Sequence, residues 1–245
     1  MTGKRFVYLL DRRWRLATAS FRMLPTFIVI GVQKGGTTSF FWNLADHPNV
    51  LRPGRKEVQA FDRGRNFSKR FYQSWFPFAP LSSNGDQRMI TGEATPTYLL
   101  NPASPARVKR LVPDVKLIVM LRNPVDRAVS QYRQNLKANR EPLDLKDALE
   151  AESERVAASI DENRNGSGQE SLDWLLFRYR GNGEYASHLQ NWLRHFDQSQ
   201  FMIFESEQYF LDPQRVLFEV HDFLGIPRHT YSSFPVMNRS KVKID

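Results

Sequence analysis

The sequence of 245 residues contains no cysteine. This absence excludes a disulfide framework and any metal site built on thiolates, and it fits a reducing compartment. Long apolar runs are also missing, because Leu9 and Leu10 are followed at once by Asp11 and Arg12. No stretch reaches the length of a signal-peptide core or a transmembrane helix. We therefore expect a cytoplasmic protein without a transmembrane segment.

Metal-ligating clusters are absent as well. The five histidines are scattered, none at a position typical of a catalytic base, so we expect no metal site. Basic residues, in contrast, are in excess: 35 Lys and Arg against 26 Asp and Glu give a formal charge of +9. Such a surface suits an anionic cofactor, an acidic substrate, nucleic acid or a membrane surface, without choosing between them. Residues 1–25 are expected to form a basic lead-in helix with a solvated face, membrane contact through its arginines being the alternative.

Apolar runs alternate with helical patterns along residues 26–245. Expected strands cover 26–30, 89–92, 115–121 and 201–204; expected helices cover 38–46, 105–111, 124–137, 144–156 and 213–224, and another opens at 183. The spacing of Phe67, Phe71 and Trp75 predicts a further helix packed in the core. This alternation predicts an α/β fold: one domain with a central parallel sheet and helices on both faces.

The stretch from Ile28 to Phe40 is the most informative in the chain. An apolar run ends at Gly31 and is followed by a lysine, two glycines and three hydroxyl residues: Lys34, Gly35, Gly36, Thr37, Thr38 and Ser39. Glycines let backbone N–H groups surround an anion, and the N-terminus of the next helix adds its positive dipole end. The pattern predicts a strand, an anion-binding loop and a helix. A Walker A loop has its lysine after the last glycine, whereas Lys34 precedes the pair, which disfavours an ordinary ATP or GTP site.

A second anion site is predicted after the strand at 115–121. Arg122 follows this strand, and Asn123 and Pro124 are good first residues of a helix. Ser130 lies about two helical turns further on and shares a face with that helix N-terminus. Arg122 and Ser130 can therefore bind one phosphate together.

These two loops resemble the nucleotide motifs of the sulfotransferases that use 3′-phosphoadenosine 5′-phosphosulfate (PAPS). The stretch 31–39 is similar to their 5′-phosphosulfate loop and 121–132 to their 3′-phosphate motif. The pair Lys56–Glu57, the segment 183–193 and Phe223-Leu224-Gly225 resemble the heparan-sulfate-type, carbohydrate branch. The resemblance covers about residues 26 to 227 and implies a P-loop-like sulfotransferase fold and a bacterial relative of that branch.

The resemblance also implies roles for individual residues. Residues 34–39 would hold the 5′-phosphosulfate, and Arg122 and Ser130 the 3′-phosphate. Lys34 would neutralise charge on the leaving oxygen, Lys56 would hold the sulfuryl oxygens, and Glu57 would take the proton from an acceptor hydroxyl or amine. From the residues alone, the favoured interpretation of Glu57 is an ion pair within the loop, with Lys56 or Arg55 as its partner. The products would be a sulfated carbohydrate or small metabolite and adenosine 3′,5′-bisphosphate.

The sequence departs from that branch at three points. Ala94 stands where these enzymes usually carry a lysine, and the disulfide-closed C-terminal hairpin cannot form. The sequence stops at Asp245, where members of that branch usually continue, so we expect the C-terminal lid over the cofactor to be short or absent. Residues 139–183, with a glycine-containing tip at 166–168, are expected to form a variable insertion bordering the acceptor site. Loops of this kind do not name the acceptor, and the oligomeric state is not predicted.

Three alternatives stay open on the sequence. A P-loop kinase acting on a small molecule would share the fold but needs Walker A order and a magnesium-binding aspartate. A nucleic-acid-binding protein would need clustered cations with exposed aromatics, whereas these cations are spread along the chain, so we expect no nucleic-acid partner. A third reading is a protein of this fold that has lost its activity.

Overall fold

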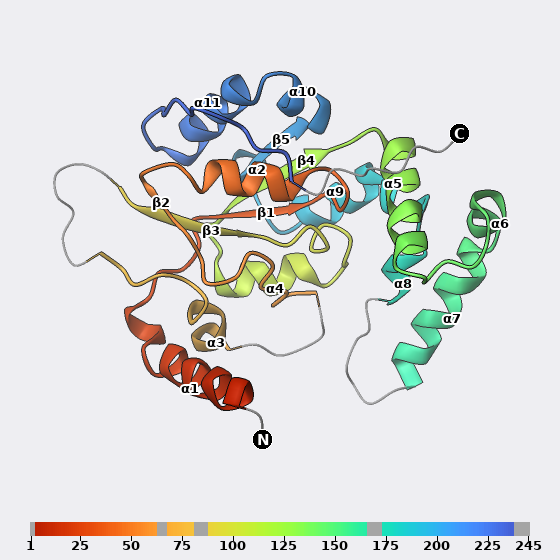
Figure 1. The fold of residues 1–245 in the computed structure, drawn as a ribbon, viewed down its shortest axis with the longest axis horizontal. Coiled ribbons are helices and arrows are strands. Elements are labelled where there is room, and N and C mark those ends of the chain that lie inside the picture. Colours follow the sequence, from red (N-terminus) through yellow and green to blue (C-terminus); the bar gives the residue numbers. More distant parts are fainter. Residues whose placement is uncertain (1–2, 63–67, 81–87, 166–172, 238–245) are drawn as a thin grey trace.

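The computed structural model describes residues 3–62, 68–80, 88–165 and 173–237. Its centre is a five-stranded parallel sheet in the order β2-β3-β1-β4-β5, which confirms the predicted α/β fold (Figure 1). The strands are β1 Phe27–Gly31, β2 Val50–Leu51, β3 Ile90–Ala94, β4 Lys116–Leu121 and β5 Phe201–Glu205. Because all strands are parallel, their carboxyl ends lie at one edge of the sheet, where α/β proteins bind ligands.

The helices are α1 Gly3–Ala17, α2 Thr37–Leu44, α3 Lys69–Gln73, α4 Ser104–Leu111, α5 Pro124–Lys137, α6 Leu145–Glu150, α7 Glu152–Asn165, α8 Asp173–Leu176, α9 Tyr185–Leu193, α10 Ser206–Leu211 and α11 Pro213–Leu224. Short 3₁₀ turns η1, η2 and η3 cover Ala19–Phe21, Gly181–Gly183 and Gln198–Gln200. Within the described part of the chain, no helix has the length and apolar character needed to cross a membrane.

Two apolar cores sandwich the sheet, and β1 contributes to both. Phe27 and Val29 pack with α2 and α11, while Ile28 and Ile30 pack with α4 and α9 on the other face. Figure 1 shows α2 and α11 on one side of the sheet and α3 and α4 on the other. Successive side chains of a strand point to opposite faces, so a continuous apolar run is what a strand covered on both sides requires.

The expected single helix over 144–156 is wrong, because the chain forms two helices that meet at Ala151. The Asp144 side chain caps the first by accepting a hydrogen bond from the Asp147 N–H. Glu152 begins the second, and its carboxylate accepts bonds from the backbone N–H groups of Arg180 and Gly181, at 2.8 and 2.9 Å. The break thus coincides with a long-range contact, which periodicity cannot reveal.

The aromatic segment forms a helix, α3, but its buried face differs from the expected one. Tyr72 and Phe76 are fully buried, whereas Phe71 and Trp75 are only partly buried. Phe67 lies outside the described residues. The two outer rings instead meet arginines of α1, as described below.

Candidate active site

The loop between β1 and α2 has the predicted strand–loop–helix form. Lys34 and Gly36 adopt left-handed backbone conformations, with φ of 71° and 88°. Gly36 is the N-cap of α2, whose first residue is Thr37. A glycine turn that leads into a helix N-terminus is the arrangement in which proteins commonly bind phosphate-like anions.

Both loop glycines are required by close neighbours. A methyl group on Gly35 would lie 2.8 Å from the backbone oxygen of Met120 in β4, and one on Gly36 would lie 2.6 Å from the ring of Phe210 in α10. The loop is therefore pressed against two elements that come much later in the chain, and only glycine fits.

The hydroxyl residues of α2 differ in their surroundings. Thr37 and Ser39 are buried, whereas Thr38 is half-buried. The Ser39 hydroxyl accepts a hydrogen bond from the Met237 N–H at 2.8 Å and faces the Met237 carbonyl at 3.4 Å. The segment after α11 thus returns to the loop and covers Ser39.

Arg122 connects the two predicted anion loops. It follows β4, next to β1 in the sheet, and its guanidinium Nη1 donates a hydrogen bond of 2.9 Å to the Lys34 carbonyl oxygen. Burial, with the nearby Arg122 charge second, lowers the pKa of the Lys34 ammonium. The side chain of Asn123 caps α5 as predicted, accepting from the Val125 and Asp126 N–H groups. Ser130 is half-buried on the same helix.

Two elements that the sequence did not reveal hold these loops in place. Ser206 at the start of α10 donates to the Gly35 carbonyl at 2.5 Å, and Glu207 accepts from the Asn123 N–H at 3.2 Å. Helix α10 therefore joins both anion loops. The one sequence feature that pointed to α10 was its position directly after β5, which ends at the same edge of the sheet as the strands before the two anion loops.

Arg127 is the second feature of the site that the sequence analysis did not single out. Its side chain is buried and donates to Gln131 Oε1 at 2.5 Å and to the Tyr179 carbonyl. Desolvation lowers the pKa of this guanidinium. Tyr185 in turn donates to the Arg122 carbonyl oxygen at 2.8 Å. Residues 179–185 are thereby fixed against the predicted 3′-phosphate motif.

Lys56 and Glu57 form an ion pair, with 2.9 Å between Lys56 Nζ and Glu57 Oε1. The Lys56 side chain is 12% exposed and that of Glu57 is 42% exposed. The carboxylate is therefore open to solvent, while the ammonium is mostly covered. Lys56 and Glu57 therefore form the ion pair that the residues alone indicated. The same pair places a carboxylate, which can accept a proton, beside a cation.

Glu93 supports the loop that carries this pair. It is fully buried at the end of β3, where its carboxylate accepts hydrogen bonds from Tyr72, Thr95 and the Val58 N–H at 2.7, 2.7 and 3.2 Å. The Tyr98 hydroxyl lies 3.2 Å from Oε1 of the same carboxylate. Burial raises the pKa of Glu93 to about 7 against the opposing effect of these bonds.

The loop is tied to the sheet by its own backbone as well. The Ala94 N–H donates to the Lys56 carbonyl at 3.2 Å, and the Ala60 N–H donates to the Tyr98 hydroxyl at 2.8 Å. Hydrogen bonds thus hold the backbone on both sides of Glu57. The loop lies at the edge of the sheet that also carries Lys34.

We expect Glu93→Gln to lower the free energy of unfolding by about 1–3 kcal/mol, because an amide NH₂ would face hydroxyl and N–H donors in a buried site. Turnover should fall as the Glu57 loop loosens, while nucleotide affinity changes little. Urea unfolding and nucleotide titration of the same samples measure both effects. A variant with parental stability would show that the carboxylate is not needed there.

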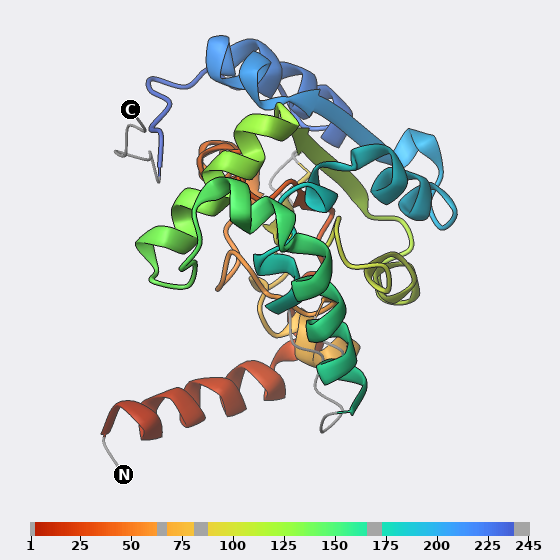
Figure 2. The same ribbon diagram turned by 90° about the vertical axis from the view of Figure 1, so that its right-hand side faces the viewer.

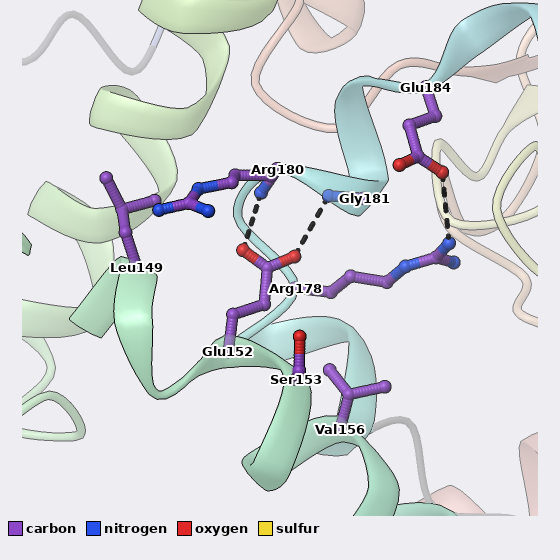
Figure 3. Close-up of a pocket in the computed structure, with 8 residues that line it drawn as sticks. All are labelled: Leu149, Glu152, Ser153, Val156, Arg178, Arg180, Gly181 and Glu184. Carbon is purple, nitrogen blue, oxygen red and sulfur yellow. Dashed lines mark hydrogen bonds and ion pairs between the residues drawn. The ribbon is translucent and has the colours of Figure 1, made fainter. Parts of the chain in front are cut away.

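A separate surface cavity of about 290 Å³ lies between the start of α7 and residues 178–184 (Figure 3). Figure 3 shows Glu152 directed at the Arg180 and Gly181 backbone, with Glu184 reaching Arg178. Part of the cavity wall belongs to the expected insertion 139–183, whose tip at 166–168 lies outside the described residues. That the insertion borders an acceptor stays a prediction.

The residues present fit the 5′ and 3′ anionic groups of PAPS. Two loops at the carboxyl edge of a parallel sheet, joined by Arg122, combine glycine backbone, a helix N-terminus and cations. Gly35 and Gly36 allow the first of these loops to pack directly against β4 and α10. Within the described ranges, no group of three or more His, Asp or Glu side chains is arranged to bind a metal ion. The sheet and its strand–loop–helix unit define an α/β protein with a P-loop-like fold.

Comparison with known proteins narrows the class further. Residues 24–244 match the sulfotransferase domain family, and the chain belongs to that family. It is 34% identical over 220 residues to human heparan sulfate glucosamine 3-O-sulfotransferase 3B1, covering 90% of this chain and 51% of that protein. It is 36% identical over 207 residues to mouse heparan sulfate glucosamine 3-O-sulfotransferase 6, covering 84% and 54%. The chain thus spans about half the length of the curated relatives it matches.

A solved structure agrees with the sequence comparison. The sulfotransferase from Alicyclobacillus acidocaldarius superposes with a TM-score of 0.69 at 26% identity, covering 90% of this chain and 87% of that one. The resemblance to sulfotransferases and to their heparan-sulfate branch is therefore confirmed, as is the fold.

Proposed function

We propose that the protein transfers a sulfuryl group from PAPS to a hydroxyl or amine of a carbohydrate or other small acceptor. The observation that carries this proposal is the contact between the two anion loops, in which Arg122 donates to the Lys34 carbonyl. One site for the 5′-phosphosulfate and one for the 3′-phosphate would then lie side by side. The relatives named above as heparan sulfate sulfotransferases support a carbohydrate acceptor.

The chain's residues would act mainly by position and charge. PAPS supplies an activated sulfuryl group, whose in-line transfer needs cations around spread negative charge, as phosphoryl transfer does. The loop amides and the Thr37 and Thr38 hydroxyls would orient the 5′ end. Lys34 would neutralise the leaving oxygen, and Arg122 with Ser130 would hold the 3′-phosphate.

Glu57 would act as general base toward the acceptor. Its carboxylate is solvent-exposed, so an acceptor can reach it, and its partner Lys56 would share its charge with the sulfuryl oxygens. An acceptor that displaces the ion pair would leave Glu57 free to take a proton. Ala94 provides no second acceptor-side cation. A screen of acceptor classes with radiolabelled PAPS, with and without magnesium, tests the activity and separates it from a kinase.

Adenosine 3′,5′-bisphosphate should raise thermal stability, because a ligand specific for the native state shifts the folding equilibrium, by about 2.7 kcal/mol at 100 times its Kd. AMP, which lacks the 3′-phosphate, should do so much less. Differential scanning fluorimetry with both nucleotides measures this. In Ser130→Ala, the shift from the bisphosphate should shrink while the shift from AMP stays the same. Equal shifts from both nucleotides in the parent would reject the 3′-phosphate assignment.

A further inference from the structure

Helix α1 and the turn η1 expose three large apolar side chains. Leu10 and Trp14 of α1 are 52% and 61% exposed, and Phe21 of η1 is 69% exposed. Leu10 and Trp14 are four residues apart, so they lie on one face of the helix, one turn above the other. Together with Phe21 they place a leucine and two aromatic rings in solvent on consecutive elements.

The orientation of this face is fixed by the opposite side of α1. The Arg15 guanidinium lies 3.9 Å from the Trp75 ring centroid, and Arg12 lies 6.0 Å from that of Phe71. Arg70 donates to the Leu16 carbonyl at 2.8 Å. At about 100° per residue, Arg12 and Arg15 lie on the side of the helix opposite Leu10 and Trp14. Figure 2 shows α1 extending from the body of the molecule.

The charge around the apolar face is positive. The first 25 residues contain six Lys and Arg but a single acidic residue, Asp11. Arg15 pairs with Asp11 at 3.0 Å, so this carboxylate is neutralised, while the neighbouring Arg13 is exposed. An exposed apolar face with a tryptophan and a flanking cation such as Arg13, on a segment of net positive charge, suits an amphipathic helix that lies on an anionic bilayer.

Other occupants fit this surface less well. A second copy of the chain would bring the same excess of arginines against it, at a cost in repulsion. Nucleic acid would use the cations but gains nothing from an exposed Leu10. A zwitterionic bilayer would accept the apolar side chains but leave the cations without partners.

We propose that the outer face of α1, with Leu10, Trp14 and Arg13, docks the protein on the surface of an anionic phospholipid bilayer. The apolar side chains enter the headgroup boundary and Arg13 remains at the phosphates. A single short helix gives reversible binding, which brings the protein to the membrane without spanning it. This docking is independent of the proposed sulfuryl transfer.

Co-sedimentation of the full chain with vesicles tests the proposal. The protein should sediment with vesicles of phosphatidylcholine mixed with phosphatidylglycerol, much less with phosphatidylcholine alone, and less again as salt is raised. Leu10→Ser combined with Trp14→Ser should lower partitioning by at least about tenfold, from lost apolar burial. Arg13→Glu should lower it by about tenfold. Leu193→Ser, at a residue 46% exposed on α9, is the matched control and should bind as the parent does.

Two further measurements test whether the variants stay folded and whether a tryptophan enters the bilayer. Thermal unfolding of every variant should match the parent, since the substituted side chains are exposed, and the tryptophan emission of the parent should shift to the blue on vesicles but not in the double variant. Equal binding to neutral vesicles, or an unchanged double variant, would overturn the proposal. So would a dimer in sedimentation velocity, without lipid, that the double variant converts to a monomer.

Discussion

Glu57→Gln should lower turnover by about 10²–10⁴-fold, the usual loss when a general base is removed. Glutamine keeps the size and much of the hydrogen bonding of Glu57 but cannot accept a proton. Affinity for adenosine 3′,5′-bisphosphate should stay near the parental value, because Glu57 lies outside both anion loops. Steady-state kinetics at saturating acceptor, with nucleotide titration on the same preparation, measure the two quantities.

The matched control addresses the ion pair between Glu57 and Lys56. If the pair served only to stabilise the loop, then Lys56→Met and Glu57→Gln would have equal, small effects, since partly exposed ion pairs contribute about 0–1 kcal/mol. We expect instead that Glu57→Gln loses the pH dependence of turnover that a titrating base produces, whereas Lys56→Met keeps it. Parental turnover in Glu57→Gln would exclude Glu57 as the base. Glu93, although buried, would then be the next carboxylate to test.

Four of the five strands, all except β2, could be predicted because the physics that forms them is local. The strand at 116–121 is apolar from Leu117 onward, as a strand buried on both faces must be. Asn123 and Pro124, two consecutive residues, mark the start of the next helix. The loop at Gly31 to Ser39 combines glycines, a lysine and hydroxyls within nine residues. The two anion motifs can therefore be recognised in the sequence without knowledge of the fold.

The parts that escaped prediction depend on contacts between distant segments. Helix α10 joins the two anion loops through Ser206 and Glu207, yet neither residue forms a recognisable pattern. The network at Glu93 connects three segments, and Arg127 binds a carbonyl 52 residues away. Glu152 accepts hydrogen bonds from two backbone N–H groups of a distant segment, at the point where a helix that periodicity would continue is divided in two. Sequence spacing carries no information on such partners.

Lys34→Ala should weaken nucleotide binding and lower turnover by about 10²–10³-fold, the loss typical of removing one group that stabilises charge in a transition state. The Lys34 side chain supplies the ammonium, whereas its backbone carbonyl receives the bond from Arg122. Alanine therefore removes the charge and leaves the bridge between the two loops in place. Because the ammonium would meet the sulfonate in both the ground state and the transition state, KM for PAPS should rise as kcat falls.

The charge-conserving variant Lys34→Arg separates the effect of the charge at this position from the effect of the side chain's shape. Lys34→Arg keeps a cation on the same left-handed residue and should retain more of the nucleotide affinity than Lys34→Ala. In Lys34→Arg, turnover should be recovered to a smaller extent than nucleotide affinity, since a planar guanidinium cannot replace a point charge at the leaving oxygen. Isothermal titration with adenosine 3′,5′-bisphosphate and single-turnover kinetics with PAPS measure binding and chemistry separately. Parental values for Lys34→Ala in both experiments would mean that the loop serves another purpose and that the assignment of the 5′ site is wrong.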